Sequence, residues 1–171
     1  MDDNGSVCKV TVDGTDFKIN EPTPFDSKWY SHKIKHAAVR YEVVVSIQKG
    51  WIVAWNGPYP AGKWSDLKIA RHSLVHELDP GEKVLADKGY RDSSGIFVTP
   101  TGGHTNLDRM KADARARHET INVRVKCWKI LEQRYRHNVS SHGKVFGAVV
   151  NIVQLVLQYE SPAYQVIYKD N

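Results

Sequence analysis

Cysteine is scarce in this chain, whose 171 residues include only Cys8 and Cys127. Two cysteines cannot build a disulfide framework, and a reducing compartment fits this count best. The sequence also lacks the C-x-x-C and H-E-x-x-H patterns that hold zinc in many proteins. These absences exclude small disulfide-stapled proteins and the common zinc modules, and a zinc site would need ligands scattered along the chain.

Long apolar runs are also missing. The most apolar stretch, residues 146–157, is interrupted by Asn151 and Gln154, so it is too short and too polar for a membrane span. The first residues, MDDNGS, lack the basic and apolar regions of a secretion signal. We therefore expect a soluble intracellular protein with no membrane contact.

Acidic residues are few in one part of the chain. Between Arg109 and Arg136 there are nine basic and three acidic residues, a net charge of +6, whereas the whole chain carries +5. The remainder therefore sums to −1. Such concentration is typical of a surface that binds a polyanion, although a solvated helix face would show the same pattern.

The residues that are present divide the chain into short strands and longer helices. The early strands follow one another directly and can pair antiparallel, whereas the later ones alternate with helices, which favours parallel additions. We therefore predict one α/β domain over 1–171, with a mixed five-stranded sheet flanked by helices. The apolar segments that predict strands cover 7–12, 36–47, 51–55, 83–87 and 96–99. The helical patterns cover 65–78, with Ser65 as the N-cap, and 108–137 and 144–159.

Two of the predicted strands end in an aspartate, Asp13 after VTV and Asp87 after VLA. Each aspartate alone could simply form a turn. If the two strands are parallel neighbours, however, both carboxylates lie at the carboxyl edge of the sheet. That edge is where open α/β sheets bind their ligands.

A third acid, Glu119, lies within the basic helix. Helical spacing places Arg115, Asn122 and Lys126 on the same side of the helix as Glu119. For Glu119 alone, an ordinary surface pair with arginine is the simpler interpretation, and such a pair is worth under ~1 kcal/mol.

Three carboxylates brought together need protons or a cation. Two unit charges ~4 Å apart repel by roughly 4 kcal/mol at an effective dielectric constant of 20. Oxygen ligands with free positions for water and phosphate suit Mg²⁺ or Mn²⁺, and two such ions can activate a water and stabilise the leaving oxygen of a phosphodiester. Beside a basic helix, these acids predict metal-dependent phosphodiester chemistry.

Four segments occur in a characteristic order: VDGTDF (12–17), WNGPYPAGKWSDLKI (55–69), LADKGYRD (85–92) and RARHETINVRVKCWKIL (115–131). There are 31 residues between the second and third acids. This pattern resembles the DDE transposase domain of the PIF/Harbinger superfamily, which includes Harbinger-derived nucleases. The resemblance implies an RNase H-like fold with metal-binding catalytic acids at Asp13, Asp87 and Glu119.

The resemblance also implies an activity and a location. The activity is DNA cleavage and strand transfer at the inverted-repeat ends of a transposon, with two Mg²⁺ or Mn²⁺ ions, and the location is the nucleus. Asp66 lies where many members have a His-Asp-Ser motif, which implies a supporting role near the metal, with helix capping as the alternative. Asp16 replaces a common His and is either a supporting carboxylate or a turn residue. The predicted DNA contacts are Lys88, Arg115, Arg117, Asn122 and Lys126.

Members of this family usually carry a helix-turn-helix region before the first catalytic strand, which here begins within the first ten residues. We therefore expect a catalytic domain alone, with sequence recognition supplied by a separate DNA-binding protein. The alternative is a domesticated or decayed transposase that binds DNA or protein without catalysis. The oligomeric state, a dimer included, stays open.

Overall fold

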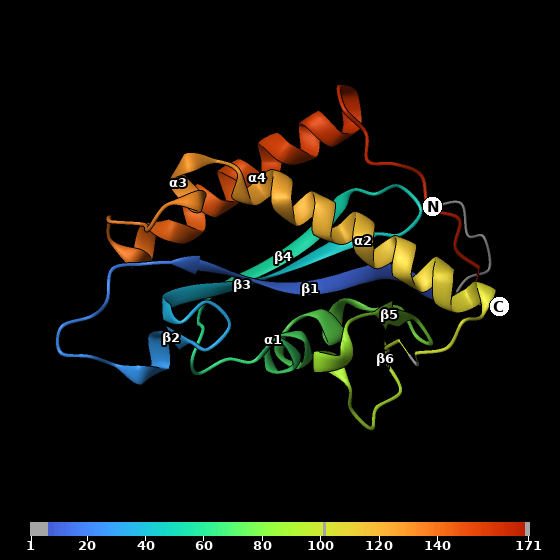
Figure 1. Ribbon diagram of the computed structural model, residues 1–171, viewed down its shortest axis with the longest axis horizontal. Coiled ribbons are helices and arrows are strands. Elements are labelled where there is room, and N and C mark those ends of the chain that lie inside the picture. The colour runs from blue at the N-terminus through green and yellow to red at the C-terminus, as the bar shows by residue number, and fades with distance from the viewer. Residues whose placement is uncertain (1–6, 101, 170–171) are drawn as a thin grey trace.

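A mixed sheet forms the centre of the protein, which the computed structural model describes for residues 7–100 and 102–169 (Figure 1). Its strands lie in the order β2-β3-β1-β5-β6, and β4 also pairs with β3. The pairs among β1 to β4 are antiparallel, whereas β5 and β6 add in parallel. The strands are β1 (Cys8–Lys18), β2 (Tyr30–Ser31), β3 (His36–Ser46), β4 (Ile52–Pro60), β5 (Lys83–Leu85) and β6 (Phe97–Val98).

The α/β fold predicted from the sequence is confirmed, with six strands in place of five. The additional strand, β2, has two residues, which is too short to show any periodic pattern. The basic segment 108–137, which was predicted as one helix, contains two helices. The helices are α1 (Asp66–His72), α2 (Asn106–Lys126), α3 (Lys129–Glu132) and α4 (His142–Tyr159).

Strand β1 is longer than predicted. The residues Asp13 to Asp16, which resemble a strand end in sequence, lie within the strand and pair with β3 as far as Lys18. The parallel pairing with β5, in contrast, stops at Thr11. The two aspartates are tolerated inside β1 because Asn122 donates a hydrogen bond to Asp13 and Arg40 donates to Asp16. Asp13 therefore lies in mid-strand, just beyond the end of the β5 pairing.

The basic helix ends earlier than predicted. Helix α2 stops at Lys126, and Trp128 adopts an extended conformation before the short helix α3. The backbone N–H of Tyr135 then donates to the carbonyl of Lys18 at 2.8 Å, and the Tyr135 side chain is buried. This pairing with the end of β1 prevents one continuous helix over 108–137.

The core lies on both faces of the sheet. Helices α2 and α4 cover one face, and α1 packs against the other (Figure 1). Alternation along β3 fits this arrangement, because Val43 and Val45 face α2 and α4 whereas Val44 faces α1. The two helical layers pack against the central strands, and the catalytic candidates lie on β1, just after β5 and on α2.

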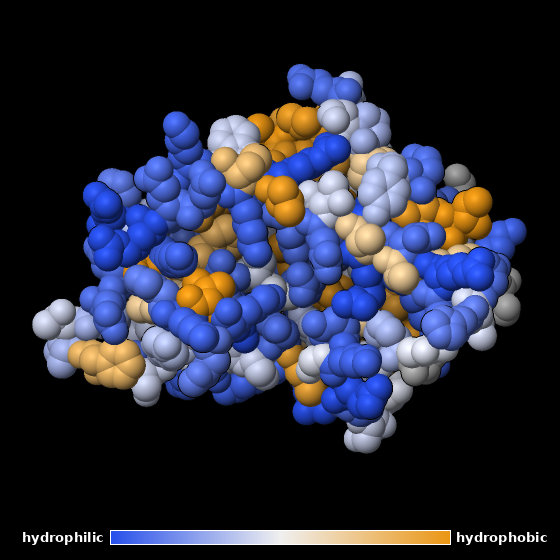
Figure 2. Space-filling model, viewed as in Figure 1, coloured by the Kyte–Doolittle hydropathy of each residue, from blue (hydrophilic) through white to orange (hydrophobic). Residues whose placement is uncertain are grey.

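Among the described residues, one helical stretch, 139–159, is long and apolar enough to cross a membrane by length and composition. Its buried side chains, such as Phe146, Val150 and Leu157, pack in the core against the sheet. The outer side keeps exposed apolar groups such as Leu155, and Figure 2 shows orange atoms along the top of the molecule. The packing is that of an amphipathic core helix.

Candidate active site

Asp13, within β1, and Asp87, two residues beyond the end of β5, follow the paired parts of two neighbouring parallel strands. Thr11 pairs with Leu85, and each aspartate follows two residues later. Asp87 begins a 3-10 turn (Lys88–Tyr90), in which its Oδ1 accepts the N–H of Gly89 at 2.7 Å. The parallel neighbours predicted from the two apolar segments are therefore present, and they bring both carboxylates to one pocket.

All three acids predicted from the sequence line this pocket. Glu119 reaches it from the exposed side of α2, although no contact joins Glu119 to Asp13 or Asp87. Among the residues that the structure describes, no group of three or more His, Cys, Asp or Glu is arranged as a metal-ligand set. The pocket is lined by Thr11, Val12, Asp13, Lys33, Asp87, Arg115, His118 and Glu119.

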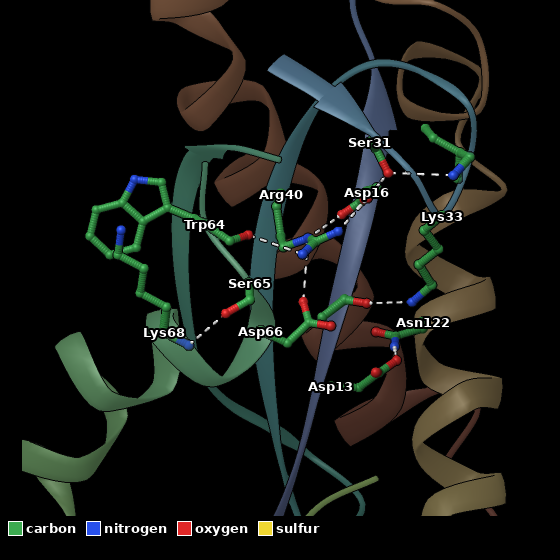
Figure 3. Close-up of polar contacts among 12 residues, drawn as sticks. Asp13, Asp16, Ser31, Lys33, Arg40, Trp64, Ser65, Asp66, Lys68 and Asn122 are labelled. Atoms are coloured by element: carbon green, nitrogen blue, oxygen red, sulfur yellow. Dashed lines mark hydrogen bonds and ion pairs between the residues drawn. The ribbon is translucent and has the colours of Figure 1, made fainter. Parts of the chain in front are cut away.

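Asp66, the first residue of α1, lies close to Asp13 and Asp87. Helix capping, one of its two predicted roles, is performed by Ser65, whose Oγ accepts the N–H of Lys68 at 3.3 Å. The Asp66 carboxylate instead lies directly over Gly14, and its Oδ1 is 3.3 Å from Nε of Arg40 (Figure 3). Asp66 therefore lies beside the acids, and its supporting role near a metal stays a prediction.

Burial makes the charged forms of two of these aspartates, Asp13 and Asp66, unfavourable. Burial raises the pKa of Asp13, Lys33 opposes that rise, and Asp66 and Asp87 add to it. Burial likewise raises the pKa of Asp66, against the effect of Arg40 and then Lys33. Oδ1 of Asp66 is buried without a hydrogen bond, since its contact with Arg40 is an ion pair only. Buried carboxylates with an oxygen left without a hydrogen bond are hard ligands that fit a divalent cation such as Mg²⁺ or Mn²⁺.

Asp16 is a structural residue in the middle of β1. Its side chain is fully buried and accepts hydrogen bonds from Nε and a terminal nitrogen of Arg40, at 2.6 and 2.8 Å. Ser31 donates a third hydrogen bond to the same carboxylate. Asp16 therefore does not turn the chain, as one alternative suggested. It fixes Arg40, which in turn faces Asp66 (Figure 3).

Two predicted DNA contacts are contradicted by burial. Arg117 is 1% exposed and donates hydrogen bonds to the carbonyls of Ser46 and Tyr164, at 3.1 and 3.3 Å. Asn122 is 6% exposed, and its Nδ2 donates to Oδ2 of Asp13 at 2.9 Å (Figure 3). Arg117 therefore ties the end of β3 to the C-terminal segment, and Asn122 orients a candidate ligand.

The other three predicted DNA contacts keep access to solvent. Arg115 lines the acid pocket, and Lys88 is exposed in the turn that follows Asp87. Lys126 is half-buried, and burial followed by the nearby Lys33 lowers its pKa. These residues remain available to phosphates near the acids.

Sequence reasoning missed two residues of the pocket wall. Lys33, in the turn after β2, donates from Nζ to the carbonyl oxygen of Gly14 at 3.0 Å. His118 is 2% exposed, its Nδ1 lies 2.7 Å from Oγ1 of Thr11, and burial lowers its pKa to about 3. His118 is therefore a neutral part of the wall at pH 7. Neither residue belongs to a recognisable motif, although His118 directly precedes Glu119.

Comparison with protein families identifies the family to which this chain belongs. Residues 12–154 match the family model described as DDE superfamily endonuclease. This chain belongs to the DDE superfamily endonucleases. The matched region contains the strands and the helix that carry the three acids, and the mixed sheet flanked by helices is consistent with the RNase H-like fold of DDE nucleases. Comparison with curated proteins and with solved structures gave no match.

A further carboxyl group, that of Glu42, is buried near the acids of this DDE domain. Glu42, on β3 opposite Gly14, is 1% exposed. Its Oε1 accepts from Nδ2 of Asn56 at 3.0 Å and from Oγ of Ser73 at 3.4 Å, but Oε2 has no hydrogen bond. Burial raises the pKa of Glu42 to about 7, against those two hydrogen bonds and with a further contribution from Asp66.

Glu42 should make stability fall as pH rises. The folded protein keeps this proton up to about pH 7, whereas the unfolded chain releases it near its ordinary pKa of 4.5. Stability from Glu42 is thus complete below pH 4.5 and is lost between pH 4.5 and 7, by about 3 kcal/mol. Buried His118, whose pKa is lowered, adds stability over the same pH range in both proteins, so the test is the difference between them. In urea unfolding at pH 4.5 and 7.5, the change in stability of Glu42→Gln should differ from that of the wild type by this amount. An equal pH dependence in both proteins would contradict the prediction.

Proposed function

We propose that this chain is the catalytic domain of a PIF/Harbinger-type transposase, or of a nuclease derived from one, that cleaves DNA with the help of divalent cations. The observation that supports it best is that Asp13 and Asp87, which follow the paired parts of two parallel strands, line one pocket together with Glu119. Membership in the DDE superfamily endonucleases supports the same reaction class.

In this proposal Asp13, Asp87 and Glu119 hold Mg²⁺ or Mn²⁺, and Asp66 supports them. Two bound ions would supply an activated nucleophile and charge for the leaving oxygen. Asn122 fixes the Asp13 carboxylate through its hydrogen bond, which limits the directions that the ligand oxygens can take. No nucleophilic side chain is needed, because water or a DNA 3′-hydroxyl group attacks the phosphorus.

The substrate side of the proposal rests on the basic residues around the pocket. Arg115, Lys126 and Lys88 lie on the two elements that carry Glu119 and follow Asp87, so DNA phosphates that bind them pass over the acids. Attack by a DNA 3′-hydroxyl group would give strand transfer at transposon ends. We place the protein in the nucleus, with a separate DNA-binding protein that recognises those ends.

Nicking of supercoiled plasmid tests the proposal. The wild type should convert supercoiled DNA to nicked circles in Mn²⁺ or Mg²⁺ and leave it intact in EDTA. Asp113→Asn, an acid-to-amide change at an exposed position of α2, should cut like the wild type. Salt-sensitive DNA binding with no cleavage in either metal would contradict the proposal and support a non-catalytic DNA-binding module.

Gly14→Ala should disturb the site without adding or removing charge. A Cβ atom at Gly14 would lie 1.8 Å from Oδ1 of Asp66, so the carboxylate must leave its place beside the strand aspartates. We expect nicking to slow by roughly 10²-fold, as for other misplaced groups in active sites. The double variant Gly14→Ala with Asp66→Ala should be no slower than Asp66→Ala alone. Additive losses would show that Gly14 acts independently of Asp66.

A further inference from the structure

Lys33 occupies an unexpected place beside the acids, and the inference drawn from it rests on the proposed function. It lies in the turn that joins β2 to β3, and its Nζ donates to the carbonyl oxygen of Gly14 (Figure 3). Gly14 directly follows Asp13, and Lys33 lines the same pocket as Asp13 and Asp87. The contact therefore holds an ammonium group next to the carboxylates.

The base of this turn is fixed by buried polar groups. Ser31 is fully buried, donates to Asp16, and accepts the backbone N–H of Ile34 at 3.4 Å. Asp16 is itself held by Arg40 through two short hydrogen bonds. The Lys33 side chain is exposed, but the backbone that carries it is held in place. Its ammonium group therefore reaches the Gly14 carbonyl oxygen from a fixed position.

The charge of Lys33 acts on the acids without pairing with any one of them. Lys33 lowers the pKa of both Asp13 and Asp66, which partly offsets the effect of burial. Among the described residues, no ion pair joins Lys33 to an acid. An ammonium has three donors, and one is used by the Gly14 carbonyl, so two remain for another acceptor.

We propose that Lys33 changes partners during the nuclease cycle. Without a divalent cation it is the counter-ion of the aspartates, and once a cation binds it contacts a non-bridging oxygen of the DNA phosphate at the site. The bound cation neutralises the carboxylates, which releases the ammonium group of Lys33. That group can then bind the DNA phosphodiester, an anion that the neighbouring Arg115 also attracts.

Two effects of opposite sign follow for Lys33→Gln. Removal of a positive charge beside the acids should tighten Mn²⁺ binding by the DNA-free protein, by about fivefold at low salt. The same change should weaken the binding of duplex DNA in the presence of Mn²⁺ and lower the kcat/KM for nicking, by about tenfold. A merely structural lysine would not improve metal affinity when it is removed.

The experiment measures Mn²⁺ affinity by electron paramagnetic resonance of the free ion, duplex affinity by fluorescence polarisation, and nicking. Lys33→Arg should keep the Mn²⁺ affinity of the wild type. Lys35→Gln, a neutral change at an exposed position of the same turn, should leave all three readouts unchanged. Unchanged or weaker Mn²⁺ binding by Lys33→Gln would overturn the counter-ion role, and unchanged DNA binding would overturn the phosphate contact. If the wild type never nicks, the proposed reaction fails while the two binding readouts still decide the role of Lys33.

Discussion

Asp87→Asn should abolish metal-dependent nicking while leaving the fold intact. The Asn Oδ1 can still accept the N–H of Gly89, so the turn after β5 keeps its hydrogen bond. The lost negative charge weakens cation binding at the point where charge develops on the phosphate. Because metal ions supply several kcal/mol to such reactions, we expect a loss on the order of 10³-fold in kcat.

Thermal unfolding followed by circular dichroism should show the same transition for Asp87→Asn and the wild type. Asp13→Asn should have the same effect on nicking, and the double variant should be no slower than either single one, because both aspartates serve one site. Retention of more than a tenth of the wild-type rate by Asp87→Asn would remove Asp87 from the reaction and contradict the assignment.

Asp16→Ala should have the largest effect on stability. The substitution leaves the Arg40 guanidinium, whose side chain is 10% exposed, without its main partner, and it also removes the acceptor of Ser31. Removal of one member of a buried ion pair costs about 3–5 kcal/mol, because the other charge stays buried without compensation. Urea denaturation should show this as a lower midpoint with an unchanged slope.

The matched control is Asp79→Ala, which removes an exposed acid 3.6 Å from Lys9. Its free energy of unfolding should change by less than ~0.5 kcal/mol. The double variant Asp16→Ala with Arg40→Met should recover part of the stability, because the buried guanidinium is removed, although Asp66 loses its ion pair. Equal losses for Asp16→Ala and Asp79→Ala would show that the Asp16–Arg40 pair is not a stabilising element.

The meeting of Asp13 and Asp87 could be predicted because it depends on local patterns. Each aspartate follows an apolar segment, and the helical pattern between those segments favours a parallel arrangement. The structure has that arrangement, with Thr11 opposite Leu85. The length of β1 could not be predicted, because Asp13 and Gly14 resemble a turn until the pairing with β3 is known.

The place of Asp66 depends on contacts between distant segments. Its carboxylate can lie over β1 only because Gly14 has no side chain, and Arg40 faces it from a third element. Neither the contact with Gly14 nor the position of Arg40 can be inferred from the sequence near Asp66. The N-cap pattern there was correct, but it described Ser65 rather than its neighbour.

The basic helix shows a different limit of sequence reasoning. Because Arg117 is charged and Asn122 carries an amide, both were predicted to lie on a polar surface. Both are instead buried and hydrogen-bonded to protein acceptors. Buried polar groups are stable when they are hydrogen-bonded, and the carbonyl of Ser46 and the carboxylate of Asp13 provide that bonding. Helical periodicity cannot distinguish such residues from those that face DNA.

Anomalous scattering from a crystal grown or soaked with Mn²⁺ is the most direct test of the account. We predict an anomalous peak bound by the carboxylates of Asp13 and Asp87, and no peak in the Asp87→Asn protein under the same conditions. Oxygen of Glu119 in the same coordination sphere would complete the predicted set of ligands. A wild-type crystal with no peak at these two aspartates, or with Mn²⁺ only at another place, would contradict the central claim that they form a metal site.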